Sequence, residues 1–102
     1  MQKLDFSMTK KEYLLVVLAE ECNEVAQRVA KILRFGFVDP KGTEPGQPYT
    51  NKDRLILELN DLLAVVEMVF EDQDIVSQML KEDKKKKVKK YLELSKKLGT
   101  LN

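Results

Sequence analysis

Apolar residues recur every three or four positions along most of the chain, and this spacing predicts helices. The first helix is expected from about Lys10 to Arg34. Thr9, with Glu12 three residues later, is typical of a capping box at a helix start, and Gly36 suits the position after a helix end. We expect this helix to bury one apolar face in the core. That face comprises Leu14, Leu15, Leu18, Cys22, Val25, Ala26, Val29 and Leu33.

A second helical pattern follows a loop at 36–50 that is rich in proline and glycine. We expect Asn51 to cap this helix, which should run to about Glu71. Apolar side chains cover almost its whole circumference. Its one clearly polar strip consists of Asp53, Asn60 and Glu67. Because such a helix must be buried on most sides and so short a chain offers few partners, we expect an oligomer, most simply a dimer.

The rest of the chain predicts a short helix around 75–80 and a last helix over 84–98, with Gly99 as its stop. The inner face of the last helix is expected to comprise Val88, Tyr91, Leu92, Leu94 and Leu98. No strand-type alternation of useful length and no internal repeat occur. We therefore expect one all-α domain over residues 1–102, with about four helices and the two long ones paired antiparallel.

Composition narrows the possible chemistry. The sequence has no histidine, which removes histidine-activated nucleophiles and zinc–histidine sites, and its single cysteine cannot form an internal disulfide. With a net charge of +1 there is no general attraction to nucleic acid, and the lysine run Lys84–Lys87 has the character of a solvated helix face, since no aromatic residues alternate with it. Neither a signal peptide nor a membrane-spanning run is present, so we expect a cytoplasmic protein with no nucleic-acid or membrane partner.

Two pairs of acids stand out within the two long helical patterns. Glu21 and Glu24 are three residues apart, as are Glu58 and Asp61, so each pair shares one helix face, about 60° apart around the axis. Two neighbouring helices with this spacing can direct four carboxylates to one point. Oxygen ligands without histidine or cysteine favour hard cations, Mg²⁺ or Mn²⁺. We therefore predict a divalent metal site.

Simpler explanations exist for each charged group. Arg54, one turn before Glu58, can form a salt bridge with it, and Arg28 can be the counter-charge of a solvated acidic patch on the first helix. Lys31 and Arg34 lie beyond the acids, near the loop. They can neutralise phosphate groups that the metal does not reach, or they can be ordinary exposed cations near a helix C-terminus.

The residues that carry these features resemble those of a known family. The stretches Leu18–Gln27, Lys31–Gly36 and Glu58–Leu63 resemble the MazG-like branch of the all-α NTP pyrophosphatases, in the form of small phage-type members. The family hallmark is Glu-Glu-x-x-Glu on one helix and Glu-x-x-Asp on the next. Here the spacer between the two motifs is longer than the usual pattern.

The resemblance implies that the protein hydrolyses nucleoside triphosphates to the monophosphate and pyrophosphate, and works as a homodimer or homotetramer. It implies Mg²⁺ held by four acids, which here are Glu21, Glu24, Glu58 and Asp61. It also implies that Glu20, the first acid of the motif, orients the attacking water or a second ion. Lys31 and Arg34 are then expected to hold the phosphates, and Asn51 to contact phosphate or sugar.

Two other functions remain open on the sequence alone. The chain can be a non-enzymatic helical interaction module whose acids and lysines are solvated faces. It can also bind a nucleotide without cleaving it. The first alternative predicts that Glu58 and Asp61 are exposed or paired with Arg54.

Overall fold

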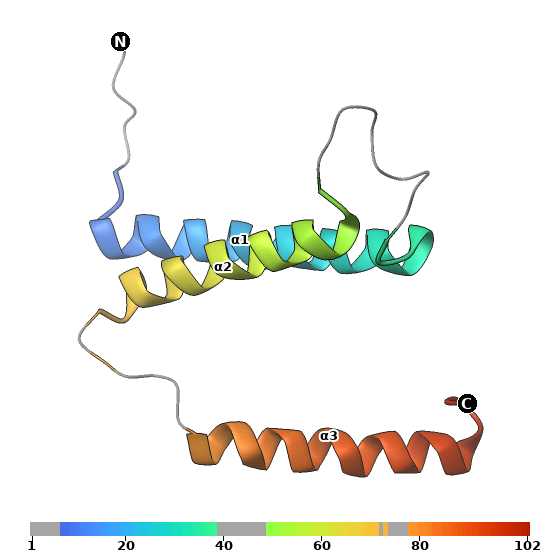
Figure 1. Ribbon diagram of the computed structural model, residues 1–102. Helices are drawn as coiled ribbons and strands as arrows, with labels where there is room; N and C mark the ends of the chain where they lie inside the picture. Colours follow the sequence, from blue (N-terminus) through green and yellow to red (C-terminus); the bar gives the residue numbers. More distant parts are fainter. Residues whose placement is uncertain (1–6, 39–48, 72, 74–77) are drawn as a thin grey trace. The chain divides into compact units, whose positions relative to one another are not determined.

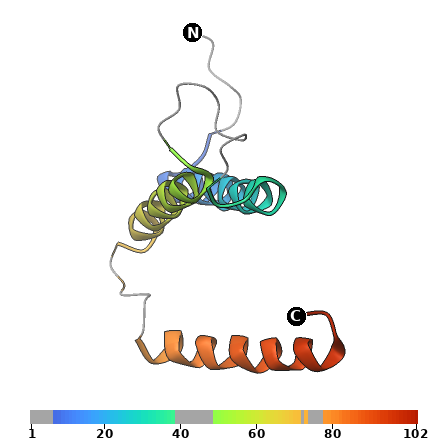
Figure 2. The ribbon, with the colours of Figure 1, turned by 45° about the vertical axis from the view of Figure 1, so that its right-hand side comes forward.

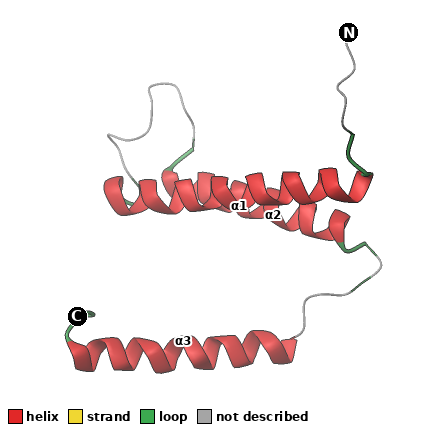
Figure 3. Ribbon diagram, turned by 180° about the vertical axis from the view of Figure 1, so that it is seen from behind, coloured by secondary structure: helices red, strands yellow, loops and turns green. Residues whose placement is uncertain are grey.

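The computed structural model describes residues 7–38, 49–71, 73 and 78–102 (Figure 1). Every regular element within these ranges is a helix, which confirms the all-α prediction (Figure 3). The helices are α1 (Lys10–Phe35), α2 (Asn51–Val69) and α3 (Gln78–Leu98). The count of about four helices is not confirmed, because the described part of the predicted short helix belongs to α3 and residues 75–77 lie outside the described ranges.

Helix α1 begins and ends where its sequence predicted, to within one residue. The Thr9 hydroxyl accepts a hydrogen bond from the Glu12 backbone at 3.1 Å, and the Glu12 carboxylate accepts one from the Thr9 backbone at 3.1 Å. This reciprocal pair satisfies two amide groups that a helix start leaves without partners. At the other end, Gly36 has φ 91° and donates its amide hydrogen to the Ile32 carbonyl at 2.7 Å. Only glycine adopts that conformation without strain.

Helix α2 is capped by Thr50, so the prediction of Asn51 as the cap is wrong. The Thr50 hydroxyl accepts from the Asp53 backbone at 3.1 Å, and the Asp53 carboxylate accepts from the Thr50 backbone at 3.2 Å. Thr50 is the cap because the acid Asp53 lies three residues after it and completes the reciprocal pair of hydrogen bonds. Asn51 is the first helical residue, and its amide donates to the Gly36 carbonyl at 3.1 Å. The helix ends at Val69, two residues before the predicted end at Glu71.

Figure 2 shows α1 and α2 lying side by side. Two hydrogen bonds place the start of α2 at the end of α1: the Asn51–Gly36 bond, and one from the Lys52 amide to the Phe37 carbonyl at 3.0 Å. The half-buried residues of α1 recur with a helical period: Leu14, Val17, Leu18, Glu21, Val25, Arg28 and Ile32. On α2 the half-buried residues are Asp53, Arg54, Leu55, Glu58, Leu62, Val65 and Val66, with Asn51 and Val69 buried.

The predicted core face of α1 is therefore only partly correct. Leu14, Leu18 and Val25 are half-buried, but five other members of that face are exposed: Leu15, Cys22, Ala26, Val29 and Leu33, the last at 82%. The physical reason is that α1 carries two apolar strips about 90° apart around its axis, and one neighbouring helix covers only one of them. Cys22 lies on the uncovered strip, so the prediction that it is a core residue is wrong for this chain.

Helix α3 belongs to a second compact unit, Asp72–Asn102, separate from the unit Met1–Glu71. It stops at Gly99, as predicted. Gly99 has φ 81° and donates to the Lys96 carbonyl at 3.1 Å, while the Thr100 amide donates to the Ser95 carbonyl at 3.0 Å. These two bonds form a Schellman motif, which satisfies carbonyls at the helix end.

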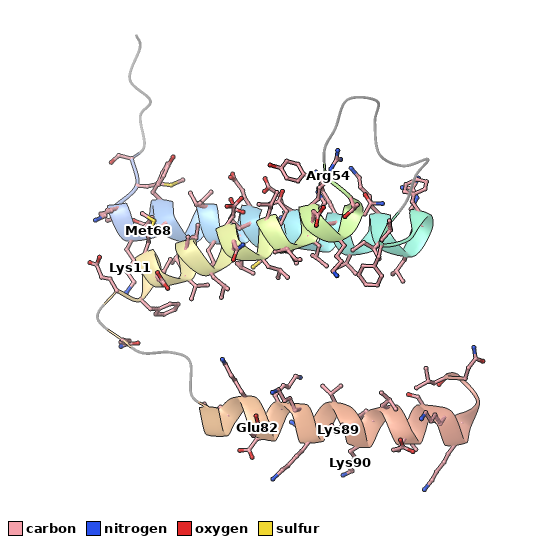
Figure 4. The ribbon with its side chains drawn as sticks, in the orientation of Figure 1. Lys11, Arg54, Met68, Glu82, Lys89 and Lys90 are labelled. Atoms are coloured by element: carbon pink, nitrogen blue, oxygen red, sulfur yellow. The ribbon has the colours of Figure 1, made fainter. Side chains whose placement is uncertain are left out.

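The predicted inner face of α3 is exposed. Val88, Tyr91 and Leu98 are 51%, 56% and 70% accessible, and Leu92 and Leu94 are exposed too. The described part of this unit is a single helix and its terminal turn, so nothing within it can cover that face. The lysines of the run Lys84–Lys87 are exposed, and Figure 4 shows the nearby Lys89 and Lys90 projecting from the helix.

Replacing Thr50 by alanine removes the hydroxyl that caps α2. We expect the free energy of unfolding to fall by about 1 kcal/mol, because one backbone amide at the helix start loses its partner. Denaturant unfolding followed by the helical circular dichroism signal measures this. Ser7→Ala, at an exposed position outside the helices, should leave stability unchanged. Equal stability of Thr50→Ala and wild type would contradict the assigned cap.

Candidate metal centre

Three carboxylates meet where α1 lies against α2. Glu21 and Glu24 come from the middle of α1, and Glu58 comes from the end of the second turn of α2. One oxygen from each of the three lies within 4.8 Å of the others. Because an α-helix has 3.6 residues per turn, Glu21 and Glu24 lie on one side of α1. This is the side that faces Glu58.

Two of these carboxylates have oxygens that are shielded from solvent. Glu21 and Glu58 are half-buried, and Oε2 of each accepts no hydrogen bond. Glu24 is exposed. Arg54, the counter-charge available on α2, forms no ion pair with Glu58 or Asp61; the ion pairs between described side chains are Lys85–Glu82 and Lys96–Glu93, both on α3. The salt-bridge explanation of the α2 acids is therefore wrong for this structure.

The clustering changes how readily these acids ionise. Removal from solvent raises the pKa of Glu21, and the charges of Glu24, Asp61 and Glu20 raise it further. Removal from solvent likewise raises the pKa of Glu58, followed by its contact with the Glu24 carboxyl and by the charges of Asp61 and Glu21. No basic side chain contributes to either shift. Among the residues that the structure describes, no cation forms an ion pair with this cluster, and unpaired negative charge of this kind is what a bound metal ion offsets.

Asp61, the fourth predicted ligand, is exposed and does not belong to the close group of three. Its charge still raises the pKa of Glu21 and of Glu58, so it lies near enough to act electrostatically on both. Glu20 is exposed as well, and its charge acts on Glu21. The structure therefore brings three of the four predicted ligands together and leaves Asp61 and Glu20 at the edge.

The predicted phosphate-binding residues lie outside this group. Lys31 and Arg34 are exposed, and the Arg34 guanidinium stands 4.8 Å from the centroid of the Phe35 ring. Asn51 is 4% exposed, and the contact that its amide nitrogen makes is the structural bond to Gly36. Its expected contact with phosphate or sugar stays a prediction.

Arg28 is a charged residue whose partial burial the sequence analysis did not predict. It is half-buried on the face of α1 that carries Glu21, and one of its guanidinium nitrogens is shielded from solvent without a hydrogen-bond partner. The seven-residue interval from Glu21, two helical turns, places both residues on one face of α1, but it does not say that α2 covers that face.

A hollow of about 380 Å³ lies beside the first turns of α2, lined by Tyr49, Asp53, Ile56 and Leu57. None of the three clustered carboxylates lines it. The side chains around it are mainly apolar and aromatic, so it differs in chemistry from the acidic group.

Comparisons with known proteins add no assignment. No family model matches the chain, and neither the curated proteins nor the solved structures contain a match. In the part of the chain that the structure describes, no helix is both long enough and apolar enough to cross a membrane. The chemistry of the carboxylate group is therefore inferred from its geometry and not from a known relative. Three close carboxylates, two with unpaired shielded oxygens, fit a hard divalent cation.

Glu58→Gln should stabilise the metal-free protein at neutral pH. The carboxyl of Glu58 has a pKa above its ordinary value of 4.5 in the folded state, so folding binds its proton more tightly. Wild type therefore loses stability as the pH rises from about 4.5 through the raised pKa, and glutamine removes that loss. Thermal melting of both proteins in a metal chelator, across pH, measures it.

The advantage of the variant should vanish below pH 4.5, where both states of wild type hold the proton. Glu67→Gln, an exposed acid of the same helix, serves as the control and should show no such trend. A Glu58→Gln protein that melts below wild type at every pH would contradict the proposed repulsion.

Proposed function

We propose that the protein is a Mg²⁺-dependent nucleoside triphosphate pyrophosphohydrolase of the MazG-like type, with the two long helices paired antiparallel. The observation that carries this proposal is the meeting of Glu21, Glu24 and Glu58 from two helices, with two shielded oxygens that accept no hydrogen bond. An acidic group of this kind is unfavourable by itself and becomes favourable when a cation joins it. The resemblance of the acidic motifs to that family supplies the reaction.

The residues that would hold the ion are Glu21, Glu24 and Glu58, with Asp61 joining from the edge. When bound there, Mg²⁺ supplies a water of lowered pKa and neutralises charge on the phosphates. Glu20, exposed and close enough to influence Glu21, would accept the proton of the attacking water. Lys31 and Arg34 would bind the outer phosphates with charged hydrogen-bond donors.

The reaction adds water across one phosphoanhydride bond. The water oxygen bonds to the α-phosphorus, the bond from that phosphorus to the bridging oxygen breaks, and pyrophosphate leaves with the electron pair. The water proton passes to a carboxylate of the site, for which Glu20 is suited because it is exposed and can release the proton to solvent. The products are a nucleoside monophosphate and pyrophosphate.

We also propose that the chain works as a homodimer or homotetramer. Many large apolar side chains of α1 and α2 are exposed, among them Leu15, Val29, Leu33, Ile56, Leu59, Leu63 and Met68. Apolar surface on this scale marks an interaction site in a soluble protein. The same exposure favours the second candidate function, a helical interaction module without activity. The two candidates differ in whether pyrophosphate is released.

Release of pyrophosphate from each common nucleoside and deoxynucleoside triphosphate, with Mg²⁺ and with chelator, tests the function. We expect metal-dependent release from at least one nucleotide. Glu58→Gln and Asp61→Asn should each lower kcat by about 100-fold or more, because several kcal/mol of transition-state stabilisation depend on the ion that they hold. Glu67→Gln should keep wild-type activity.

Binding of nucleotide without release would identify a nucleotide-binding protein that does not cleave. Absence of both binding and release would leave the interaction module. If the wild type releases pyrophosphate, a Glu58→Gln, Asp61→Asn double variant with normal turnover would refute the assignment of these acids.

Leu63→Glu should reduce the oligomer. Leu63 is 55% exposed on α2, and a carboxylate placed in an apolar interface must either remain unpaired or prevent association. Light scattering coupled to size-exclusion chromatography measures the mass. Asn60→Glu, which also introduces one negative charge but on the polar strip of the same helix, is the control. A wild-type mass equal to one chain would contradict the proposed assembly.

A further inference from the structure

Two arginines, one on α1 and one on α2, form no ion pair with an acid among the residues that the structure describes. Arg28 on α1 and Arg54 on α2 are both half-buried. One guanidinium nitrogen of Arg28 is shielded from solvent and donates no hydrogen bond. Neither arginine takes part in the ion pairs between described residues, although three carboxylates lie one to two helical turns away. Figure 4 shows Arg54 in the first turn of α2.

The register of the two helices places these arginines at one level. Glu24 and Glu58 belong to the carboxylate group, and the start of α2 is bonded to the end of α1 at Gly36. Four residues from Glu24 toward that end is Arg28, and four residues from Glu58 toward the same end is Arg54. Each step is one turn, about 6 Å along the axis. Both arginines therefore lie one turn beyond the carboxylates, toward the end of the helix pair where α2 begins.

The two arginines do not relieve the negative charge beside them. Neither arginine forms an ion pair with any of the three carboxylates. The positive charges thus form a zone of their own, next to the negative one. A half-buried guanidinium with an unpaired donor destabilises the protein. An anion that accepts hydrogen bonds from both arginines would remove this cost.

We propose that Arg28 and Arg54 form an anion site that binds the phosphate chain of the nucleotide, one turn beyond the carboxylates. This inference rests on the proposed function, because the carboxylate group and its ion would hold the neighbouring phosphate. The chemistry of the site is specific. Planar guanidinium groups from two sides donate paired hydrogen bonds to phosphate oxygens, which exposed Lys31 and Arg34 do less effectively in water.

The test is binding of inorganic pyrophosphate to the full chain, measured by calorimetry in millimolar Mg²⁺. The variants are Arg28→Met and Arg54→Met, which keep much of the side-chain volume and remove the charge. We expect each to bind pyrophosphate at least about tenfold more weakly, since each loses charged hydrogen bonds. Lys52→Met, an exposed cation of the same helical turn as Arg54, is the matched control and should bind like wild type.

Melting without ligand separates this role from a structural one. If the arginines serve the anion, both methionine variants should melt at or above the wild-type temperature, because an unpaired charge has been removed. A structural arginine predicts a lower melting temperature. Arg28→Lys should retain part of the pyrophosphate affinity and serves as the second variant if a methionine variant loses its helical signal.

Wild-type protein that does not bind pyrophosphate, or methionine variants that bind it within twofold of wild type, would overturn the anion site. Failure of the proposed function is distinct. Arginine-dependent binding of pyrophosphate by a protein that cleaves no nucleotide would leave the anion site standing without the enzyme. Metal-dependent turnover with unchanged KM in both variants would leave the enzyme standing without this site.

Discussion

The rest of the structure depends on the packing of α1 against α2. This contact is not purely apolar. Along its line of half-buried positions, leucines and valines alternate with Glu21, Arg28, Arg54 and Glu58. Apolar burial holds the two helices together and thereby partly removes these charged side chains from solvent. The apolar part of the contact, which includes Leu14 and Leu18 on α1 and Leu62 to Val69 on α2, thus stabilises a charged part nearer the start of α2.

Local signals were sufficient for much of the fold. The ends of α1 and the stop of α3 follow from capping residues and glycines that act within a few positions of themselves, so the sequence could show them. The start of α2 was misplaced by one residue because Thr50 and Asn51 are both good caps, and the choice depends on Asp53. That dependence is still local, and the spacing of Thr50 and Asp53 could have resolved it.

The rotation of α1 could not be predicted in the same way. Two apolar strips compete for one neighbour, and nothing in the periodicity decides between them. The Gly36–Asn51 bond holds the start of α2 beside the end of α1, and it joins residues fifteen apart, so the local pattern does not show it. Cys22 lies on the strip that α2 does not cover and is exposed, whereas Arg28 lies on the covered strip and is half-buried. The spacing of each acid pair could be read from the sequence, because residues three apart share a helix face under either rotation. The meeting of Glu58 with Glu21 and Glu24 depends on the rotation that the structure shows, with Asp61 left at the edge.

The bond between Asn51 and Gly36 has a consequence for how this chain tolerates change. It closes the connection between α1 and α2 at its base, together with the bond from Lys52 to Phe37. Residues inserted or deleted between the two anchor points alter only a closed loop, whose entropy changes slowly with length. Changes in the length of the connection between these anchors therefore leave the alignment of α2 on α1 unchanged. The acids on the two helices keep their positions.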